Sequence, residues 1–262
     1  MNSSTPARMK VRGPAVPRWY KPPINDADAV GDAIRAWRAR GGAGRAWIVV
    51  ESLYSMDGDR APLANLIEVA DRHEAFLFVD EAHATGIFGP QGRGLAHGLE
   101  SRDNVIVLHT CGKALGASGA LVTGPALIRD YLVNRCRPFI YATAPSPLMA
   151  VAAFEALDIL RDEPERRERL AGLVAFAGEA LEARCGIRPS GSQILPVIVG
   201  DNFRTMALAT ALQGRGFDVR GIRPPTVPEG TARLRVSLTL NVGEEDIADM
   251  IEALAELKRI NI

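Results

Sequence analysis

Residues 75–83 read A-F-L-F-V-D-E-A-H, and this stretch decides the fold. A short apolar run ends in the carboxylate of Asp80, and the imidazole of His83 follows three residues later. Two other runs, A-W-I-V-V at 46–50 and V-I-V-L at 105–108, have the same apolar character. Short continuous apolar runs that alternate with helical patterns are typical of parallel strands covered on both faces. The sequence therefore predicts an α/β fold with a mostly parallel sheet.

Hydrophobic periodicity and capping residues place the other elements around these strands. Before residue 162 we expect a further strand at 120–123 and helices at 27–40, 62–73 and 147–161. Beyond residue 162 we expect strands at 194–199 and 234–238 and helices at 164–183, 202–213 and 244–258. These patterns predict a disordered arm (1–20), a large α/β domain (21–161) and a small α+β domain (162–262).

The composition excludes several classes of protein. The chain has 262 residues, of which 47% are hydrophobic, so it can bury a core and is not an intrinsically disordered protein. Lys and Arg number 31, as do Asp and Glu, and this balance argues against a nucleic-acid binder. No apolar run approaches the roughly 20 residues that span a membrane. The three scattered cysteines and the lack of a secretory signal predict a cytoplasmic protein without a metal site.

Chemically useful side chains follow the predicted strands. Lys113 lies in T-C-G-K-A-L-G and Ser55 in S-M-D-G-D, each just after an apolar run. Ligands of open α/β sheets bind beyond the carboxyl ends of the strands, where Asp80 and His83 are also expected. A lysine can form a Schiff base with an aldehyde cofactor, and an aspartate can keep a pyridine nitrogen protonated. The combination favours pyridoxal phosphate.

Other interpretations of these residues deserve comparison. D-E-A-H is also a helicase motif, but a P-loop needs G-x-x-x-x-G-K-[ST], and here Val107 replaces the first glycine and Ala114 the final hydroxyl residue. A single lysine among glycines is usually a solvated lysine, and an aspartate at a strand end is usually a cap. Taken one at a time, these residues leave both interpretations open; the joint occurrence of Lys113, Asp80 and His83 inside the motifs quoted next favours the cofactor interpretation.

Four motifs carry a resemblance to a known family. S-M-D-G-D, V-D-E-A-H-A-T-G-I-F-G-P-Q-G-R-G, T-C-G-K-A-L-G and I-R-P-P-T-V-P-E-G-T-A-R-L-R resemble the α-oxoamine synthases, which are fold-type I pyridoxal-phosphate enzymes. The resemblance implies part of a fold-type I large domain followed by a small domain. V-G-D-N at 199–202 and I-R-P-P-T-V-P most resemble the biotin-pathway members, which condense L-alanine with pimeloyl-CoA or pimeloyl-acyl-carrier protein. Aminoketobutyrate ligase and aminolevulinate synthase are the alternatives within the family.

The resemblance also implies roles for individual residues. Lys113 would be the Schiff-base lysine and proton carrier, Asp80 would face the pyridinium nitrogen, and His83 would face the phenolic oxygen. The expected set is completed by Ser55 beside the cofactor, Thr110 and Thr143 at its phosphate, Thr226 at the substrate and Arg235 at the amino-acid carboxylate, with Arg233 as the competing residue. Because Thr143 would reach the phosphate of a neighbouring subunit, the resemblance implies a homodimer with shared active sites.

The chain departs from the family pattern at its start. The resemblance begins near Ile24, whereas family members are considerably longer on the N-terminal side. No histidine precedes His73, and no glycine-rich phosphate loop precedes Ser55, so part of the expected cofactor cup is missing. We therefore expect one of three situations: a misplaced start codon, a gene divided into two cooperating chains, or a non-catalytic remnant that acts as an interaction module.

Overall fold

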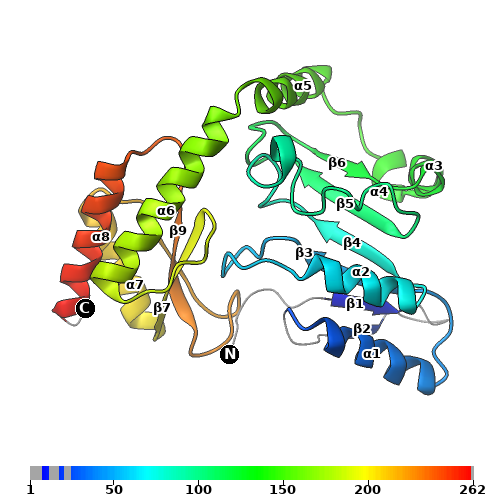
Figure 1. Cartoon of the computed structure of the whole chain (residues 1–262), viewed down its shortest axis with the longest axis horizontal. Coiled ribbons are helices and arrows are strands. Elements are labelled where there is room, and N and C mark those ends of the chain that lie inside the picture. Colours follow the sequence, from blue (N-terminus) through cyan, green and yellow to red (C-terminus); the bar gives the residue numbers. More distant parts are fainter. Residues whose placement is uncertain (1–7, 12–17, 21–24, 261–262) are drawn as a thin grey trace. The chain divides into compact units, whose positions relative to one another are not determined.

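The computed structural model describes residues 8–11, 18–20 and 25–260, which form two compact units (Figure 1). The first unit consists of Pro6–Leu53 and Arg60–Pro164. The second consists of Glu165–Ile262 and the short segment Tyr54–Asp59. A turn in the first half of the sequence thus belongs to the same unit as the C-terminal residues, which the linear division of the sequence did not anticipate.

A six-stranded sheet in the order β2-β1-β3-β4-β5-β6 forms the first unit. Its centre is parallel and consists of β3 (Ala46–Glu51), β4 (Phe76–Asp80) and β5 (Val105–Thr110). The edge strand β6 (Ala120–Thr123) pairs antiparallel with β5. The three apolar runs of the sequence are therefore the three parallel strands, and the predicted α/β fold is confirmed.

Two short strands lie in the segment that the sequence analysis assigned to a disordered arm. β1 (Arg8–Val11) pairs antiparallel with β3, and β2 (Arg18–Tyr20) pairs antiparallel with β1. The rest of residues 1–20 lies outside the described residues. The strands are only four and three residues long (R-M-K-V and R-W-Y), too short for hydrophobic periodicity to have marked them.

Burial alternates along β3 and β4, whereas the first three residues of β5 are all buried. In β3 the side chains of Ile48 and Val50 are buried, whereas Trp47 and Val49 are half-buried. Trp47 stacks on Phe76 of β4, its partner in the register, with ring centroids 4.7 Å apart. One face of β3 and β4 is therefore buried and the other half-buried, while β5 buries residues on both faces. Continuous apolar runs did not reveal this, since apolar residues occupy both faces.

The described residues of the first unit contain the α-helices α1 (Ala27–Ala39), α2 (Leu63–Arg72), α3 (Ala126–Arg135), α4 (Arg137–Ile140) and α5 (Pro147–Asp162), and a short 3-10 helix at Pro90–Gly92. Asp26 caps α1 by accepting a hydrogen bond from the Ala29 amide at 2.8 Å, as its position before the helix predicts. α1 packs beside α2, and α2 packs on β4. The helices α3 and α4 were not predicted, and neither has a buried residue.

A three-stranded antiparallel sheet in the order β7-β9-β8 forms the centre of the second unit. Its strands are β7 (Ile194–Gly200), β8 (Arg220–Ile222) and β9 (Ala232–Ser237). Its helices are α6 (Glu165–Cys185), α7 (Asn202–Gly214) and α8 (Glu244–Arg259). α8 buries Ile247, Met250 and Leu254, which lie on one face at helical spacing.

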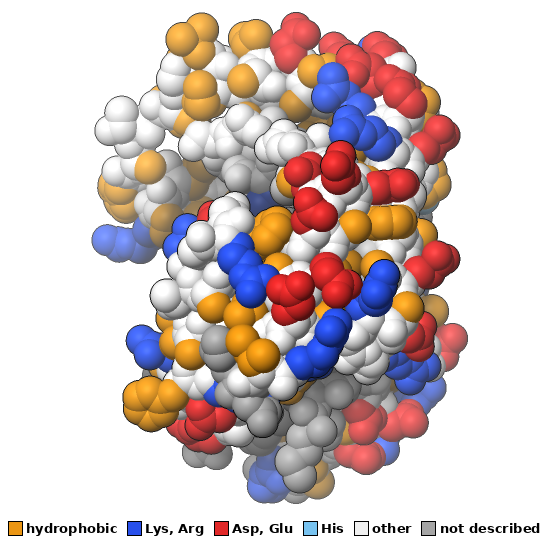
Figure 2. Space-filling view, turned by 90° about the vertical axis from the view of Figure 1, so that its left-hand side faces the viewer, with side chains coloured by type: hydrophobic (Ala, Val, Ile, Leu, Met, Phe, Trp, Pro, Cys, Tyr) orange, Lys and Arg blue, Asp and Glu red, His pale blue; other side chains and the backbone are white. Residues whose placement is uncertain are grey.

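Charges of both signs are interspersed on the surface where α6 and α8 lie (Figure 2). Arg184 and Glu252 form an ion pair of 3.5 Å between these two helices. No helix among the described residues has the length and apolarity to cross a membrane. The same residues contain no group of three His, Cys, Asp or Glu side chains placed to hold a metal ion.

Candidate active site

Asp80 and Thr110 lie at the carboxyl ends of neighbouring parallel strands. Asp80 ends β4 and is paired in the register with Leu108 of β5, so Thr110 lies two residues further along β5 and on the same face. Oδ1 of Asp80 accepts a hydrogen bond of 2.8 Å from the Ala82 amide, which fixes the carboxylate at the edge of the sheet. His83 follows in the turn after β4 and is half-buried.

Lys113 lies in the turn that joins β5 to β6. Its carbonyl accepts a hydrogen bond of 3.0 Å from the Gly116 amide, and the Cys111 amide donates to the Gly119 carbonyl at 2.9 Å. Cys111 and Leu115 are buried against Ala153 of α5, so the turn is held from within. The Lys113 side chain is exposed, and its amine makes no ion pair or hydrogen bond with the described residues. The turn therefore presents an available primary amine.

A buried carboxylate beside Asp80 supports this edge of the sheet. Glu81 is fully buried, accepts a hydrogen bond of 2.7 Å from Ser52 Oγ, and also accepts one from the Ala96 amide. Gly94 has φ +98°, and a Cβ on it would lie 2.6 Å from the Glu81 carboxyl. Glu81 was not among the residues predicted from the sequence. Its position next to Asp80 and the downstream glycines were the only signals, and neither identifies a partner.

The S-M-D-G-D turn and strand β9 meet in the second unit. Arg235 Nε donates a hydrogen bond of 2.6 Å to the Ser55 carbonyl. Gly58 has φ +66°, and a Cβ on it would lie 2.4 Å from the Ile194 carbonyl of β7. Only glycine fits this turn without strain, because the backbone is left-handed and packs closely on a neighbouring strand. Two candidate residues separated by 180 positions are thus in direct contact.

The two arginines of R-L-R have different environments. Arg233 is 0% exposed, forms an ion pair with Asp57, and donates to the Thr231 carbonyl at 3.0 Å. Arg235 is partly exposed and donates to Ser237 Oγ at 2.8 Å. Since a substrate must reach its binding residue from solvent, the geometry favours Arg235 over Arg233 for a carboxylate.

The remaining candidates are exposed. Thr143 lies between α4 and α5, and Thr226 lies in the turn between β8 and β9, where its amide donates to the Arg223 carbonyl at 3.1 Å. The structure brings Asp80, His83, Thr110 and Lys113 to one edge of the large sheet, and it brings Ser55 and Arg235 together in the second unit. The roles of all these residues remain predictions.

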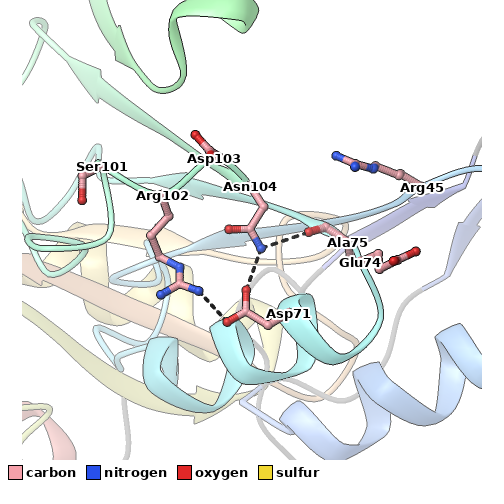
Figure 3. Close-up of a pocket in the computed structure, with 8 residues that line it drawn as sticks. All are labelled: Arg45, Asp71, Glu74, Ala75, Ser101, Arg102, Asp103 and Asn104. Atoms are coloured by element: carbon pink, nitrogen blue, oxygen red, sulfur yellow. Dashed lines mark hydrogen bonds and ion pairs between the residues drawn. The ribbon is translucent and has the colours of Figure 1, made fainter.

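A cavity of about 490 Å³ lies at the opposite edge of the sheet, before the parallel strands begin (Figure 3). Here Asp71 accepts hydrogen bonds from Arg102 at 2.5 Å and from Asn104 at 2.8 Å. Asn104 also donates to the Ala75 carbonyl at 3.4 Å. These side chains are engaged with one another and tie α2 to the loop before β5. The cavity lies at the amino ends of the strands, away from the candidate residues, so we assign it a structural role.

Comparison with known proteins agrees with this geometry. The 8-amino-7-oxononanoate synthase of Anaeromyxobacter dehalogenans is 47% identical over 222 residues, which cover 84% of this chain and 56% of that protein. Among solved structures, Sphingomonas wittichii serine palmitoyltransferase matches with a TM-score of 0.82 and 27% identity over 90% of this chain and 60% of that one. The 8-amino-7-oxononanoate synthase of Francisella tularensis matches with a TM-score of 0.72 and 26% identity, covering 87% and 68%.

These matches fix the family and also show an incomplete overlap. The chain spans little more than half the length of the curated relatives it matches. Residues 18–254 nevertheless match the family described as aminotransferase class I and II, which is most of the sequence. The fold of the solved α-oxoamine synthases and the strand-end motifs agree with that match. The chain therefore belongs to the aminotransferase class I and II family, within its α-oxoamine synthase branch.

Proposed function

We propose that this chain carries catalytic residues of a pyridoxal-phosphate-dependent 8-amino-7-oxononanoate synthase. In this reaction L-alanine loses its carboxylate as carbon dioxide, its Cα forms a bond to the carbonyl carbon of a pimeloyl thioester, and the thiol of CoA or acyl-carrier protein leaves. The observation that carries the proposal is the placement of Asp80, Thr110 and Lys113 at one carboxyl edge of the sheet. The 47% identity to a named synthase supports the choice of substrates.

The residues at the strand ends fit the cofactor. The exposed amine of Lys113 makes no ion pair or hydrogen bond with the described residues, as a lysine that binds an aldehyde requires. Oδ1 of Asp80 is hydrogen-bonded to a backbone amide, which orients the carboxylate. When bound, pyridoxal phosphate withdraws electrons from the amino-acid Cα. Asp80 would hold the proton on the ring nitrogen, His83 would bind the phenolic oxygen, and Thr110 would bind the phosphate.

Residues of this chain would also handle the substrate. Lys113 Nζ would take and return the proton at Cα, because an amine beside that carbon is a suitable general base. Arg235 would bind the amino-acid carboxylate, since a planar guanidinium pairs with a carboxylate through two parallel hydrogen bonds. Its bond to the Ser55 carbonyl holds the guanidinium in position. Thr226 would contact the substrate, and Ser55 would lie beside the cofactor.

A second copy of the chain is part of the proposal. Thr143 would reach the cofactor phosphate of the neighbouring subunit. Apolar side chains are exposed on and near α3 and α4, including Leu127 at 79% and Tyr141 at 75%. Monomeric proteins rarely expose contiguous apolar surface of this kind, so a protein interface here is expected. Light scattering of the purified chain tests the homodimer, and a strict monomer would contradict the sharing of active sites.

The first experiment concerns cofactor binding. Pyridoxal phosphate is added to the purified 262-residue chain, and the visible absorbance of protein-bound cofactor is recorded after gel filtration. We expect an absorbance band that is lost in Lys113→Ala and retained in Lys258→Ala, which removes a lysine of the second unit. A folded chain without the band, as judged by circular dichroism, would contradict cofactor binding by this chain alone and would favour a non-catalytic interaction module.

The second experiment concerns the amino acid and the thioester. Carbon dioxide release is measured with L-alanine, glycine or L-serine, each with pimeloyl-CoA or pimeloyl-acyl-carrier protein. The structural match to a serine palmitoyltransferase makes L-serine the specific competitor. Preference for L-alanine supports the proposal. Preference for glycine with acetyl-CoA or succinyl-CoA would instead support an aminoketobutyrate ligase or an aminolevulinate synthase.

A further inference from the structure

A second cavity, of about 350 Å³, lies within the first unit between the sheet and α5. It is lined by side chains of β5, β6, α5 and the glycine-rich loop that follows β4. Its volume is near the lower limit of small-molecule pockets, which suits a ligand of metabolite size. None of the residues assigned above to the cofactor or the substrate lines it.

The cavity lies on the opposite face of the sheet from Asp80 and Thr110. His109, which lines the cavity, directly precedes Thr110 in β5, and successive strand residues point to opposite faces. Leu121 of β6 is the register partner of His109 and also lines the cavity. The two faces are separated by the sheet itself, so this cavity is distinct from the candidate active site.

Hydrogen bonding determines the proton position on His109. Thr85 Oγ1 donates its single hydrogen to the Glu81 carbonyl at 2.9 Å, because a carbonyl can only accept. The contact of 2.9 Å between Thr85 Oγ1 and His109 Nδ1 must then have the imidazole as donor. In the neutral ring the proton is therefore on Nδ1, and Nε2 is a hydrogen-bond acceptor. Burial lowers the pKa of His109, which favours this neutral form.

The charges that line the cavity are partly uncompensated. Arg161 of α5 pairs with Asp158 and with Asp162, each at 2.7 Å, so this arginine is engaged by two carboxylates. The Arg93 side chain is exposed and makes no ion pair or hydrogen bond with any described residue. Glu100 Oε2 accepts from the Gly98 amide at 2.8 Å, and the Glu100 charge acts on His109. The Arg93 cation and the Glu100 carboxylate thus remain to bind a ligand that carries both a negative and a positive group.

We propose that this cavity binds a free zwitterionic α-amino acid with an apolar side chain. Arg93 binds its carboxylate, and Glu100 and His109 Nε2 accept hydrogen bonds from its ammonium group. Leu121, Leu157 and Leu160 form an apolar wall for the side chain. A zwitterion matches the pairing of one cation with one carboxylate, whereas a simple anion would lie beside Glu100 without a compensating charge. This proposal is independent of the catalytic function proposed above.

Calorimetric titration of the whole chain with L-leucine, in the absence of pyridoxal phosphate, tests the proposal. We expect saturable binding with a dissociation constant of about 1 mM or tighter. Arg93→Gln should weaken binding by about tenfold or more, corresponding to about 1.4 kcal/mol. Arg135→Gln, which removes another exposed arginine of the same unit, should leave binding unchanged. Arg235→Gln should also leave it unchanged, which distinguishes the cavity from the proposed substrate site.

Three ligand analogues keep the test informative if a variant does not fold. Leucinamide lacks the carboxylate, 4-methylpentanoate lacks the ammonium group, and glycine lacks the apolar side chain. Each should bind more weakly than L-leucine to the unaltered protein. Absence of saturable L-leucine binding, or binding equal to that of L-leucine by leucinamide, 4-methylpentanoate or glycine, would overturn the proposal.

Discussion

Arg235 Nε donates a hydrogen bond of 2.6 Å to the main-chain oxygen of Ser55. Ser55 lies in the S-M-D-G-D turn and Arg235 in β9, so two of the four recognised motifs are in contact within one unit. The neighbouring Arg233 donates to the Met56 carbonyl at 3.4 Å and pairs with Asp57. The R-L-R motif therefore holds the turn at two points, one buried and one partly exposed.

Replacement of Arg233 by methionine should destabilise the protein. The guanidinium is 0% exposed and the Asp57 side chain 19%, so the substitution removes a buried cation from a mostly buried carboxylate. Removal of one member of a buried pair costs about 3–5 kcal/mol, and partial exposure of Asp57 places the expectation near 3 kcal/mol. Urea unfolding measures the change. Arg215→Ala breaks an exposed pair with Glu256 and should cost at most about 1 kcal/mol; equal losses would contradict the structural role of Arg233.

Replacement of Arg235 by lysine should affect binding of the amino-acid substrate more than the stability of the fold. Lysine keeps the positive charge but lacks the planar fork that binds a carboxylate with two hydrogen bonds. We expect the KM for the amino acid to rise about tenfold or more, while the KM for the thioester stays near its original value. Steady-state kinetics with each substrate varied in turn measures both. An unchanged KM for the amino acid would rule out Arg235 as the carboxylate ligand.

Removal of the Ser52 hydroxyl should weaken the edge of the sheet. Ser52 Oγ donates to the buried Glu81 carboxylate at 2.7 Å, and Ser52→Ala leaves that acceptor short of a partner. An unsatisfied buried acceptor costs about 1–3 kcal/mol. Denaturant unfolding should show this loss. The exposed Ser101 makes no side-chain hydrogen bond with the described residues, so Ser101→Ala should show almost none. Identical unfolding midpoints for the two variants would contradict this account.

Stability should fall as the pH decreases below 6.5. Burial lowers the pKa of His109 from its ordinary value of 6.5, so the unfolded chain takes up a proton at a higher pH than the folded chain. Because the unfolded state then binds more protons, the free energy of unfolding decreases as the pH falls through 6.5 toward the folded pKa. Urea unfolding at several pH values measures the slope. His109→Gln should reduce this slope. The slope of His73→Gln is measured for comparison, because burial also lowers the pKa of His73.

The strand ends of the large sheet were predictable from local sequence. Residues 75–80 consist of an apolar run closed by Asp80, and such a short run, rich in aromatic and β-branched residues, is typical of a strand buried in a parallel sheet. The end of each run fixes where a polar side chain leaves the core, which is why Asp80 and Lys113 could be assigned to the same edge. The helices α3 and α4 escaped prediction because neither has a buried residue, so no apolar face marks them in the sequence.

The sequence by itself determined the alternation of strands and helices and the motifs that mark the family, because both depend on residues close together in the chain. Only the tertiary structure decided that Arg233 is buried against Asp57, 176 residues away, while the next arginine of R-L-R is partly exposed. It also decided that Glu81 accepts from Ser52 and that His109 donates to Thr85. Such pairings depend on which distant segments the loops bring together, and local hydrophobic periodicity does not identify those partners.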